Sequence, residues 1–222
     1  MVWRVGAADR AKWIALCAAG EVMGLALGAM WYRSIEQAFG APEDLVQRIP
    51  VVFFLALAGL LEGAVLGSMQ AFALRRMYPR LPIGLWINMT VVIAVTGWGI
   101  GALYDAAAGP LLAQSAPNLI QEGLIAAAFG AVVGAAYGWG QALAFGRAAH
   151  NAKAWIGASV IAWTLALPVI VLAARALPEG VAPLQAALSA LAAGLGAGLI
   201  VGVVTSFAFQ GMPPREPERS AA

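Results

Sequence analysis

Two glutamates, Glu21 and Glu62, lie inside long apolar stretches of the sequence, where a carboxyl group has few ordinary structural roles. A charged side chain at the centre of a bilayer costs about 2.5–3.5 kcal/mol on insertion scales, so an intramembrane carboxyl group is by default a candidate site for a proton or a cation. No lysine or arginine lies deep in either stretch to neutralise these glutamates. We therefore expect carboxyl groups that are protonated, that share a proton or a cation, or that reach water.

A structural role is the alternative for both glutamates. A neutral glutamate can join two helices by a hydrogen bond to a backbone carbonyl or to a polar side chain, such as Asn88 or Thr90. Counted from the same predicted membrane edge at about 1.5 Å per residue, Glu21 and Glu62 lie at similar depths. The sequence leaves both roles open.

Few other groups in the sequence suggest chemistry. The single histidine, His150, lies in a predicted loop, and the single cysteine, Cys17, lies in an apolar run. These counts exclude an intrachain disulfide and a bis-histidine haem, and they argue against a histidine-rich metal site. No glycine-rich nucleotide fingerprint follows a predicted strand. We therefore predict that the protein is not an enzyme and binds no cofactor or metal.

Composition indicates that the elements holding the glutamates are membrane-spanning helices. The chain of 222 residues is 62% hydrophobic and 11% charged, whereas soluble domains contain about 25% charged residues. A helix needs about 20 apolar residues to cross the hydrocarbon. The segments that qualify are Trp13–Tyr32, Val51–Leu74, Pro82–Leu103, Leu119–Phe145, Ala154–Ala174 and Leu184–Phe209. The predicted fold is all-α: a polytopic domain of six transmembrane helices over residues 1–210, followed by a disordered, proline-rich cytoplasmic tail over residues 211–222.

Basic residues cluster on alternate sides of the spans and predict the orientation of the chain. They lie before the first span (Arg4, Arg10, Lys12), after the second (Arg75, Arg76, Arg80) and after the fourth (Arg147, Lys153). Because lysine and arginine are enriched in cytoplasmic loops, we expect both termini in the cytoplasm of a bacterial-type cell and the protein in its plasma membrane. The second cluster either anchors the topology or contacts anionic lipid head groups. The 13 basic and 11 acidic residues nearly cancel, so nucleic acid is not an expected partner.

Glycines and a glutamine recur with one spacing in the second and fourth spans. The residues are Gly63, Gly67 and Gln70 in the second span and Gly134, Gly138 and Gln141 in the fourth. Positions i, i+4 and i+7 share a helix face, where glycines admit a neighbouring backbone and a glutamine hydrogen-bonds across the contact. We predict that each stripe packs against protein, and a substrate groove is the alternative.

The recurrence extends into the spans that follow, where Trp86 precedes Thr90 and Trp155 precedes Ser159 with equal spacing. Spans two and three are thus predicted to form one copy of a repeat, and spans four and five the second. Both copies run in the same direction, which puts any pseudo-symmetry axis along the membrane normal.

The pattern E-G-x3-G-x2-Q-x3-L-R-R, followed by a proline and an interfacial tryptophan, resembles the repeated segments of uncharacterised bacterial multi-pass membrane proteins. The resemblance is good over Glu62–Trp98 and weaker over Gly134–Trp163, where the sequence Phe145–Gly146–Arg147 replaces the Leu-Arg pair. It covers about a third of the chain. It implies a multi-pass topology and no particular chemistry.

The functional expectation follows from short loops, glycine faces and the lack of a catalytic set. These features favour an accessory or scaffolding subunit that contacts the bilayer and either other membrane subunits or copies of itself. The rival is a small proton- or cation-coupled transporter or channel that uses Glu21 and Glu62, and a third option is a binder of lipid or a lipophilic cofactor. Three deep tryptophans, Trp98, Trp139 and Trp163, are expected to pack between helices.

Overall fold

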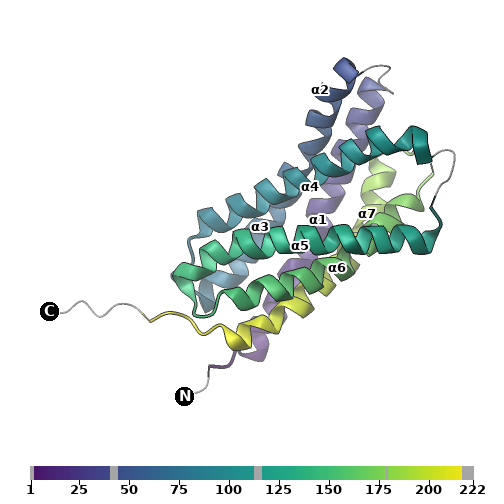
Figure 1. Ribbon diagram of the computed structural model, residues 1–222. Helices are drawn as coiled ribbons and strands as arrows, with labels where there is room; N and C mark the ends of the chain where they lie inside the picture. The colour runs from purple at the N-terminus through teal and green to yellow at the C-terminus, as the bar shows by residue number, and fades with distance from the viewer. Residues whose placement is uncertain (1–2, 41–44, 113–116, 179, 217–222) are drawn as a thin grey trace.

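The computed structural model describes the chain except for residues 1–2, 41–44, 113–116, 179 and 217–222 (Figure 1). The helices are α1 (Ala7–Phe39), α2 (Leu45–Ala56), α3 (Ala58–Met77), α4 (Ile83–Leu112), α5 (Leu119–Ala148), α6 (Lys153–Arg175), α7 (Pro183–Ser206) and the short 3₁₀ helix η1 (Ala208–Gly211). Six helical runs in the described residues are long and apolar enough to cross a bilayer. Helices satisfy their own backbone hydrogen bonds in hydrocarbon. The chain is therefore an all-α, multi-pass membrane protein, as the sequence predicted.

The second predicted span consists of two helices, α2 and α3, which meet at Leu57. At this junction the Leu57 amide donates to the Phe54 carbonyl at 3.2 Å, a tighter turn than an α-helix. The indole of Trp31 on α1 donates to the same carbonyl at 2.7 Å. A neighbouring helix thereby helps to satisfy the backbone group at the break. The combined run Arg48–Met77 still has the length and hydropathy of one span.

The six long helices form a closed ring in which each helix contacts two others. The order around the ring is α1, α3, α4, α5, α6, α7 and back to α1. The short helix α2 packs outside this order, mainly against α4 and α1. Figure 1 shows that α4 and α5 diverge towards the end of the bundle opposite the two termini.

Glycines bring three pairs of neighbouring helices into backbone contact. The triplets are Gly59, Gly63 and Gly67 of α3 against α4, Gly130, Gly134 and Gly138 of α5 against α6, and Gly194, Gly198 and Gly202 of α7 against α1. A methyl group at Gly134 would lie 2.5 Å from the carbonyl oxygen of Ser159, closer than any real contact. Because lipid tails are as apolar as leucine, helix association in a bilayer depends on such close packing.

A cluster of aromatic side chains fills the ring near the end that carries both termini. The Trp155 ring lies 5.7 Å from the rings of Trp13 and Trp86, and it stacks on Phe209 at 5.7 Å. Phe145 completes the cluster at 5.0 Å from Trp155. All five side chains are buried, so helices α1, α4, α5 and α6 and the segment after α7 share one core.

The start of α1, the α3–α4 loop, the α5–α6 loop and the C-terminal segment lie at the same end of the bundle (Figure 1). The basic clusters therefore share one end, as the alternation of loops predicted. Residues 211–216 differ from the expected disordered tail because they pack against this end. Met212 is fully buried and its carbonyl accepts a hydrogen bond from the Tyr78 hydroxyl at 2.8 Å. The rest of the expected tail, residues 217–222, lies outside the described residues.

Candidate functional site: a buried pair of carboxyl groups

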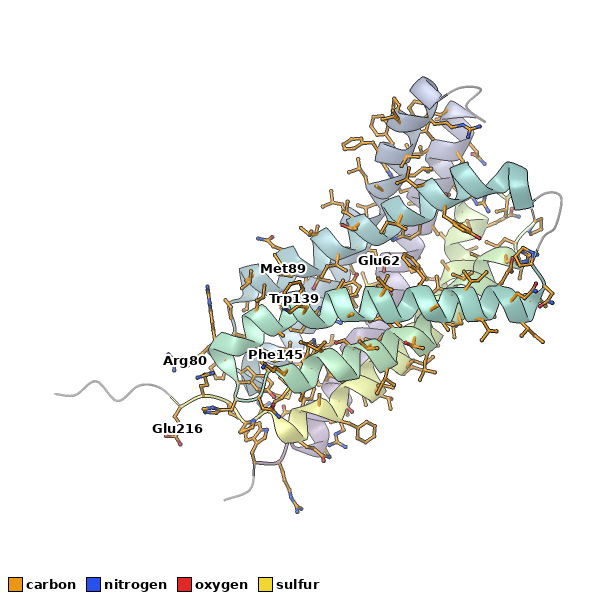
Figure 2. All side chains as sticks on the ribbon, viewed as in Figure 1. Glu62, Arg80, Met89, Trp139, Phe145 and Glu216 are labelled. Carbon is orange, nitrogen blue, oxygen red and sulfur yellow. The ribbon has the colours of Figure 1, made fainter. Side chains whose placement is uncertain are left out.

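Glu21 of α1 and Glu62 of α3 both lie inside the membrane-spanning part of the bundle, on helices that pack against each other; Figure 2 labels Glu62. Glu21 is fully buried, and Glu62 is only 5% exposed. Helices α1 and α3 pack directly against each other, and the two carboxyl groups are close enough to interact electrostatically. Their similar depth was predictable, but their proximity depends on the packing of α1 against α3.

Glu62 has a partner that the sequence did not suggest, because it accepts a hydrogen bond from the indole of Trp98 on α4. The expected partners are engaged elsewhere or point away. Asn88 is exposed, and the Thr90 hydroxyl donates to the carbonyl of Trp86 at 2.9 Å. An indole N–H only donates, so Trp98 holds one oxygen of Glu62 as an acceptor.

Glu21 has no such partner. Both of its carboxyl oxygens are buried, and neither has a hydrogen-bond partner among the described residues. Leaving a buried polar group unpaired costs about 1–3 kcal/mol, and more for a charged one. Tyr137 of α5 lies within electrostatic range of both glutamates, and its ring stacks on Trp163 with centroids 4.8 Å apart. The site thus has unused acceptor capacity beside a second carboxyl group.

Glycines of neighbouring helices cover both glutamates. A methyl group at Gly24 of α1 would lie 3.0 Å from the Cα of Glu62. On the other side, a methyl group at Gly198 of α7 would lie 3.0 Å from the Cβ of Glu21, and one at Gly194 would lie 2.7 Å from the Glu21 carbonyl oxygen. The carboxyl pair is therefore enclosed by backbone contacts among α1, α3 and α7.

The glutamines of the two predicted stripes meet at the centre of the ring. Gln70 and Gln141 are 3% and 2% exposed. The Gln141 amide donates to the Gln70 oxygen at 3.4 Å and to the Thr90 hydroxyl at 3.0 Å, while its own oxygen accepts from the Trp155 indole at 2.9 Å. The Gln70 amide in turn lies 3.8 Å from the Cys17 sulfur. Both glutamines are therefore buried and hydrogen-bonded to side chains of neighbouring helices.

Thr205 on α7 occupies a place comparable to the two glutamines, and the sequence reasoning missed it. It follows Gly202 with the same spacing that separates each glutamine from its preceding glycine. Its hydroxyl accepts from the Trp13 indole at 3.0 Å, as Gln141 accepts from Trp155. The glycine spacing in the last span could have pointed to Thr205, but the last span has a threonine where the other two stripes have a glutamine, so the pattern was not recognised. The two-copy repeat itself stays a prediction.

The deep aromatic residues behave differently from one another. Trp163 is 5% exposed and packs between helices, and Trp98 is partly buried beside Glu62. Trp139 is 71% exposed, so the expectation that it packs between helices of this chain is wrong. The sequence signal that could have marked Trp98 and Tyr137 as part of the site is the polar group at the end of each ring, because a buried indole or phenol usually finds a hydrogen-bond partner.

The three arginines of the second basic cluster, for which a topology anchor and a lipid head-group contact were the alternatives, have different surroundings. The Arg75 guanidinium lies over the Phe72 ring at 4.2 Å. The Arg76 side chain points towards Asp9, with 3.9 Å between its Nε and an Asp9 oxygen. Arg80 lines a pocket, which it shares with residues of the end of α5, the α5–α6 loop and the C-terminal segment.

No group of three or more histidine, cysteine, aspartate or glutamate side chains in the described part of the chain could hold a metal ion. No protein-family model matches the chain, and no curated protein or solved structure is significantly similar to it. A functional assignment therefore rests on the geometry of the carboxyl pair and its surroundings.

Proposed function

We propose that this is a non-enzymatic, proton-coupled membrane protein of the small transporter or channel class, in which Glu21 and Glu62 bind the transferred proton. One observation carries the proposal. Glu21 is fully buried in a membrane-spanning helix, neither of its oxygens has a hydrogen-bond partner among the described residues, and the charged group that acts on it electrostatically is another carboxyl group, Glu62. A structural glutamate needs a hydrogen-bond partner, and Glu21 lacks one among the described residues.

A proton suits this pair better than a metal cation. Two ionised carboxylates side by side repel each other, whereas one shared proton removes the repulsion and gives an oxygen of each group a partner. Calcium takes about six to eight oxygen ligands, which two glutamates do not supply. Trp98 strengthens the case, because its indole occupies one Glu62 oxygen and leaves the other for the shared proton.

We further propose that the protein lies in a plasma membrane with both termini in the cytoplasm. The support is the positive-inside rule, together with the gathering of the basic segments at the end of the bundle that carries both termini. Under this orientation the carboxyl pair lies between the cytoplasmic aromatic cluster and the outer ends of α1 and α3.

The expected accessory role is the second candidate, and Trp139 favours it. This residue lies about 14 Å along the axis from the end of α5 at Ala148, at about 1.5 Å per residue, and it is 71% exposed. An indole N–H in hydrocarbon has no acceptor, which costs about 1–3 kcal/mol. A helix of another subunit or of a second copy would supply one. Under this proposal Trp139→Leu lowers the yield of the intact complex in mild detergent and leaves the isolated chain folded.

Proton flux into liposomes tests the first proposal. The purified chain is reconstituted with an entrapped pH-sensitive dye, and an imposed pH gradient with a potassium ionophore drives the flux. We expect flux above that of protein-free liposomes, and we expect Glu21→Gln and Glu62→Gln each to abolish it. Glu36→Gln is the matched control, because it makes the same chemical change in an ion pair with Arg33 at the end of α1.

Two results would contradict proton coupling. The first is wild-type flux no greater than that of empty liposomes. The second is a loss of flux in the Glu36→Gln control equal to the loss in the Glu21→Gln and Glu62→Gln variants. In the first case, thermal unfolding of the two variants tells whether the glutamates are structural, because a structural pair loses stability when one member is replaced.

A further inference from the structure

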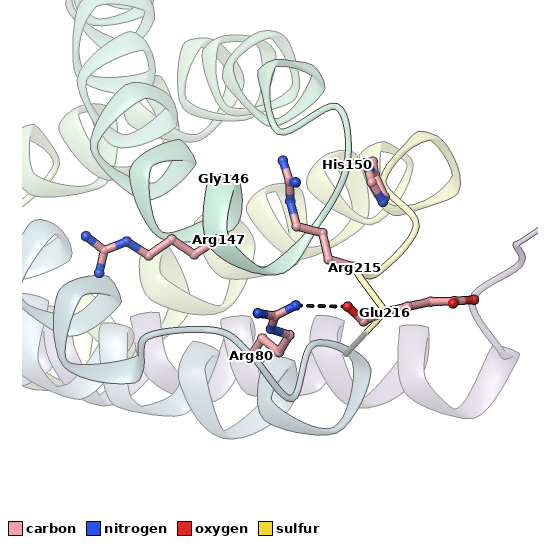
Figure 3. Close-up of a pocket in the computed structure, with 6 residues that line it drawn as sticks. All are labelled: Arg80, Gly146, Arg147, His150, Arg215 and Glu216. Carbon is pink, nitrogen blue, oxygen red and sulfur yellow. Dashed lines mark hydrogen bonds between the residues drawn. The ribbon is translucent and has the colours of Figure 1, made fainter. Parts of the chain in front are cut away.

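A second feature of the molecule, independent of the carboxyl pair, is a basic pocket at the end that carries both termini (Figure 3). Its volume is about 710 Å³. The residues that line it are Arg80, Gly146, Arg147, His150, Arg215 and Glu216. They come from the α3–α4 loop, the end of α5, the α5–α6 loop and the C-terminal segment, so only the folded chain forms this pocket.

Backbone hydrogen bonds hold the walls of the pocket in place. The amide of Arg215 donates to the Ala148 carbonyl at 2.8 Å, and the amide of His150 donates to the Pro213 carbonyl at 2.9 Å. An isolated β-bridge joins the same two segments between Ala149 and Pro214. The C-terminal segment is therefore fixed against the α5–α6 loop, which sets the positions of the basic side chains.

Two of the three guanidinium groups are themselves oriented by backbone carbonyls. Arg80 donates to the Glu216 carbonyl at 2.9 Å, the bond drawn in Figure 3, and the Nε of Arg215 donates to the Ala149 carbonyl at 3.2 Å. Each bond engages one of the five N–H groups of an arginine. The remaining donors stay available to a ligand.

The pocket has more positive than negative charge. Among the described residues that line it, the one carboxylate belongs to Glu216, and Figure 3 shows this carboxylate on the opposite side from Arg147. Within the described part of the chain, no ion pair engages Arg80, Arg147 or Arg215. Three positive charges on the walls of one pocket favour the binding of an anion there.

We propose that this pocket binds a phosphate group. Arginine forks match the geometry of phosphate oxygens and form strong charge-assisted hydrogen bonds with them. Arg147 lies in the last turn of α5, and Arg80 follows closely after α3 ends at Met77. This places the pocket at the level of lipid head groups, so the phosphate can belong to an anionic phospholipid or to a soluble phosphate.

The alternative explanation is that these arginines only anchor the topology. Arg75 supplies the matched control, because it carries the same charge at the same end of the bundle but lies over Phe72, outside the pocket. A topology anchor or a general positive surface predicts equal effects for Arg75 and Arg147. A phosphate pocket predicts an effect for Arg147 alone.

Two arms of one experiment distinguish the sources of phosphate. In the first, inorganic phosphate is titrated at constant ionic strength against the full chain in a neutral detergent, and the rise in unfolding temperature reports binding. In the second, the full chain is reconstituted in phosphatidylcholine vesicles containing phosphatidic acid, re-extracted in mild detergent, and analysed by native mass spectrometry for retained phosphatidic acid. Arg147→Gln, Arg215→Gln and Arg75→Gln are compared with the wild type in both arms.

We expect phosphate-dependent stabilisation or retained phosphatidic acid in the wild type, with apparent affinity at least about tenfold weaker in Arg147→Gln, which corresponds to about 1.4 kcal/mol. Arg75→Gln should stay close to the wild type. Binding of phosphatidic acid alone identifies a lipid head group as the source, and binding of both probes shows that any phosphate group suffices. Binding of neither probe, or equal weakening by Arg75→Gln and Arg147→Gln, overturns the proposal. Arg215→Gln provides the same test if Arg147→Gln unfolds at a lower temperature without phosphate.

Discussion

Replacing Gly138 by alanine should destabilise the bundle, because the added methyl group has no room. It would lie 2.7 Å from the Cα of Ile156 and 3.1 Å from the Cβ of Ser159, both on α6. The first contact is with backbone, which cannot rotate away, so α5 and α6 must separate. Overpacking of this kind costs about 1–3 kcal/mol. Alanine returns up to about 1 kcal/mol of intrinsic helix propensity relative to glycine, so the net loss should be roughly 0–3 kcal/mol.

Gly157→Ala is the matched control on the facing helix. Nothing lies within 4 Å of a methyl group at Gly157, so this change keeps only the propensity gain of up to about 1 kcal/mol. The two variants should therefore differ by about 1–3 kcal/mol, the overpacking term alone. Thermal unfolding in detergent, followed by tryptophan fluorescence, measures the difference. The melting temperature of Gly157→Ala should equal or exceed that of the wild type, and the melting temperature of Gly138→Ala should be the lowest of the three. Equal melting temperatures for the two variants would refute the argument that glycine is required at Gly138 for helix contact.

Three further predictions follow from single contacts. Tyr78→Phe removes the hydrogen bond to the C-terminal segment and should lower the free energy of unfolding by about 0.5–1.5 kcal/mol. Burial raises the pKa of the Tyr78 hydroxyl, so wild-type stability should fall as the pH rises above about 10, the pKa of tyrosine in the unfolded chain. Alkaline unfolding of Tyr78→Phe should lack this pH-dependent loss of stability. Thr205→Val leaves the Trp13 indole buried without its acceptor and should cost about 1–3 kcal/mol in thermal unfolding, whereas Thr205→Ser should restore most of the stability. In a background without the native cysteine, Ala182→Cys should react with an impermeant maleimide on intact cells and Gly146→Cys only after permeabilisation; the reverse pattern would invert the proposed topology.

Some features of the fold were readable from the sequence because they depend on composition along the chain. Six apolar runs predicted the six spans, and the alternation of basic loops predicted that these loops gather at one end. The glycine and glutamine stripes predicted contact with protein, because a glutamine amide in hydrocarbon is costly. These signals are local or periodic along the chain, so they can be read without knowing which helices pack together.

Other features were not readable, and Trp139 shows the reason. In water, the apolar face of a helix marks the side that turns inward, but in a bilayer the lipid is as apolar as the protein core. Hydrophobicity therefore does not orient a membrane helix, and a deep tryptophan can face a neighbour, as Trp163 does, or the outside, as Trp139 does. Only small and polar residues carry orienting information.

The features of the candidate site also divide into those readable from the sequence and those that depend on the tertiary structure. The sequence alone identified Glu21 and Glu62 as carboxyl groups at similar depth with no deep lysine or arginine beside them, because charge in an apolar run is visible without a structure. Only the tertiary structure decided that α1 packs against α3, that Trp98 donates to Glu62, and that Tyr137 lies within electrostatic range of both glutamates. These relations depend on the order of helices around the ring and on their rotation. Both are set by glycine contacts between segments distant in sequence, and no single stretch of the chain encodes them.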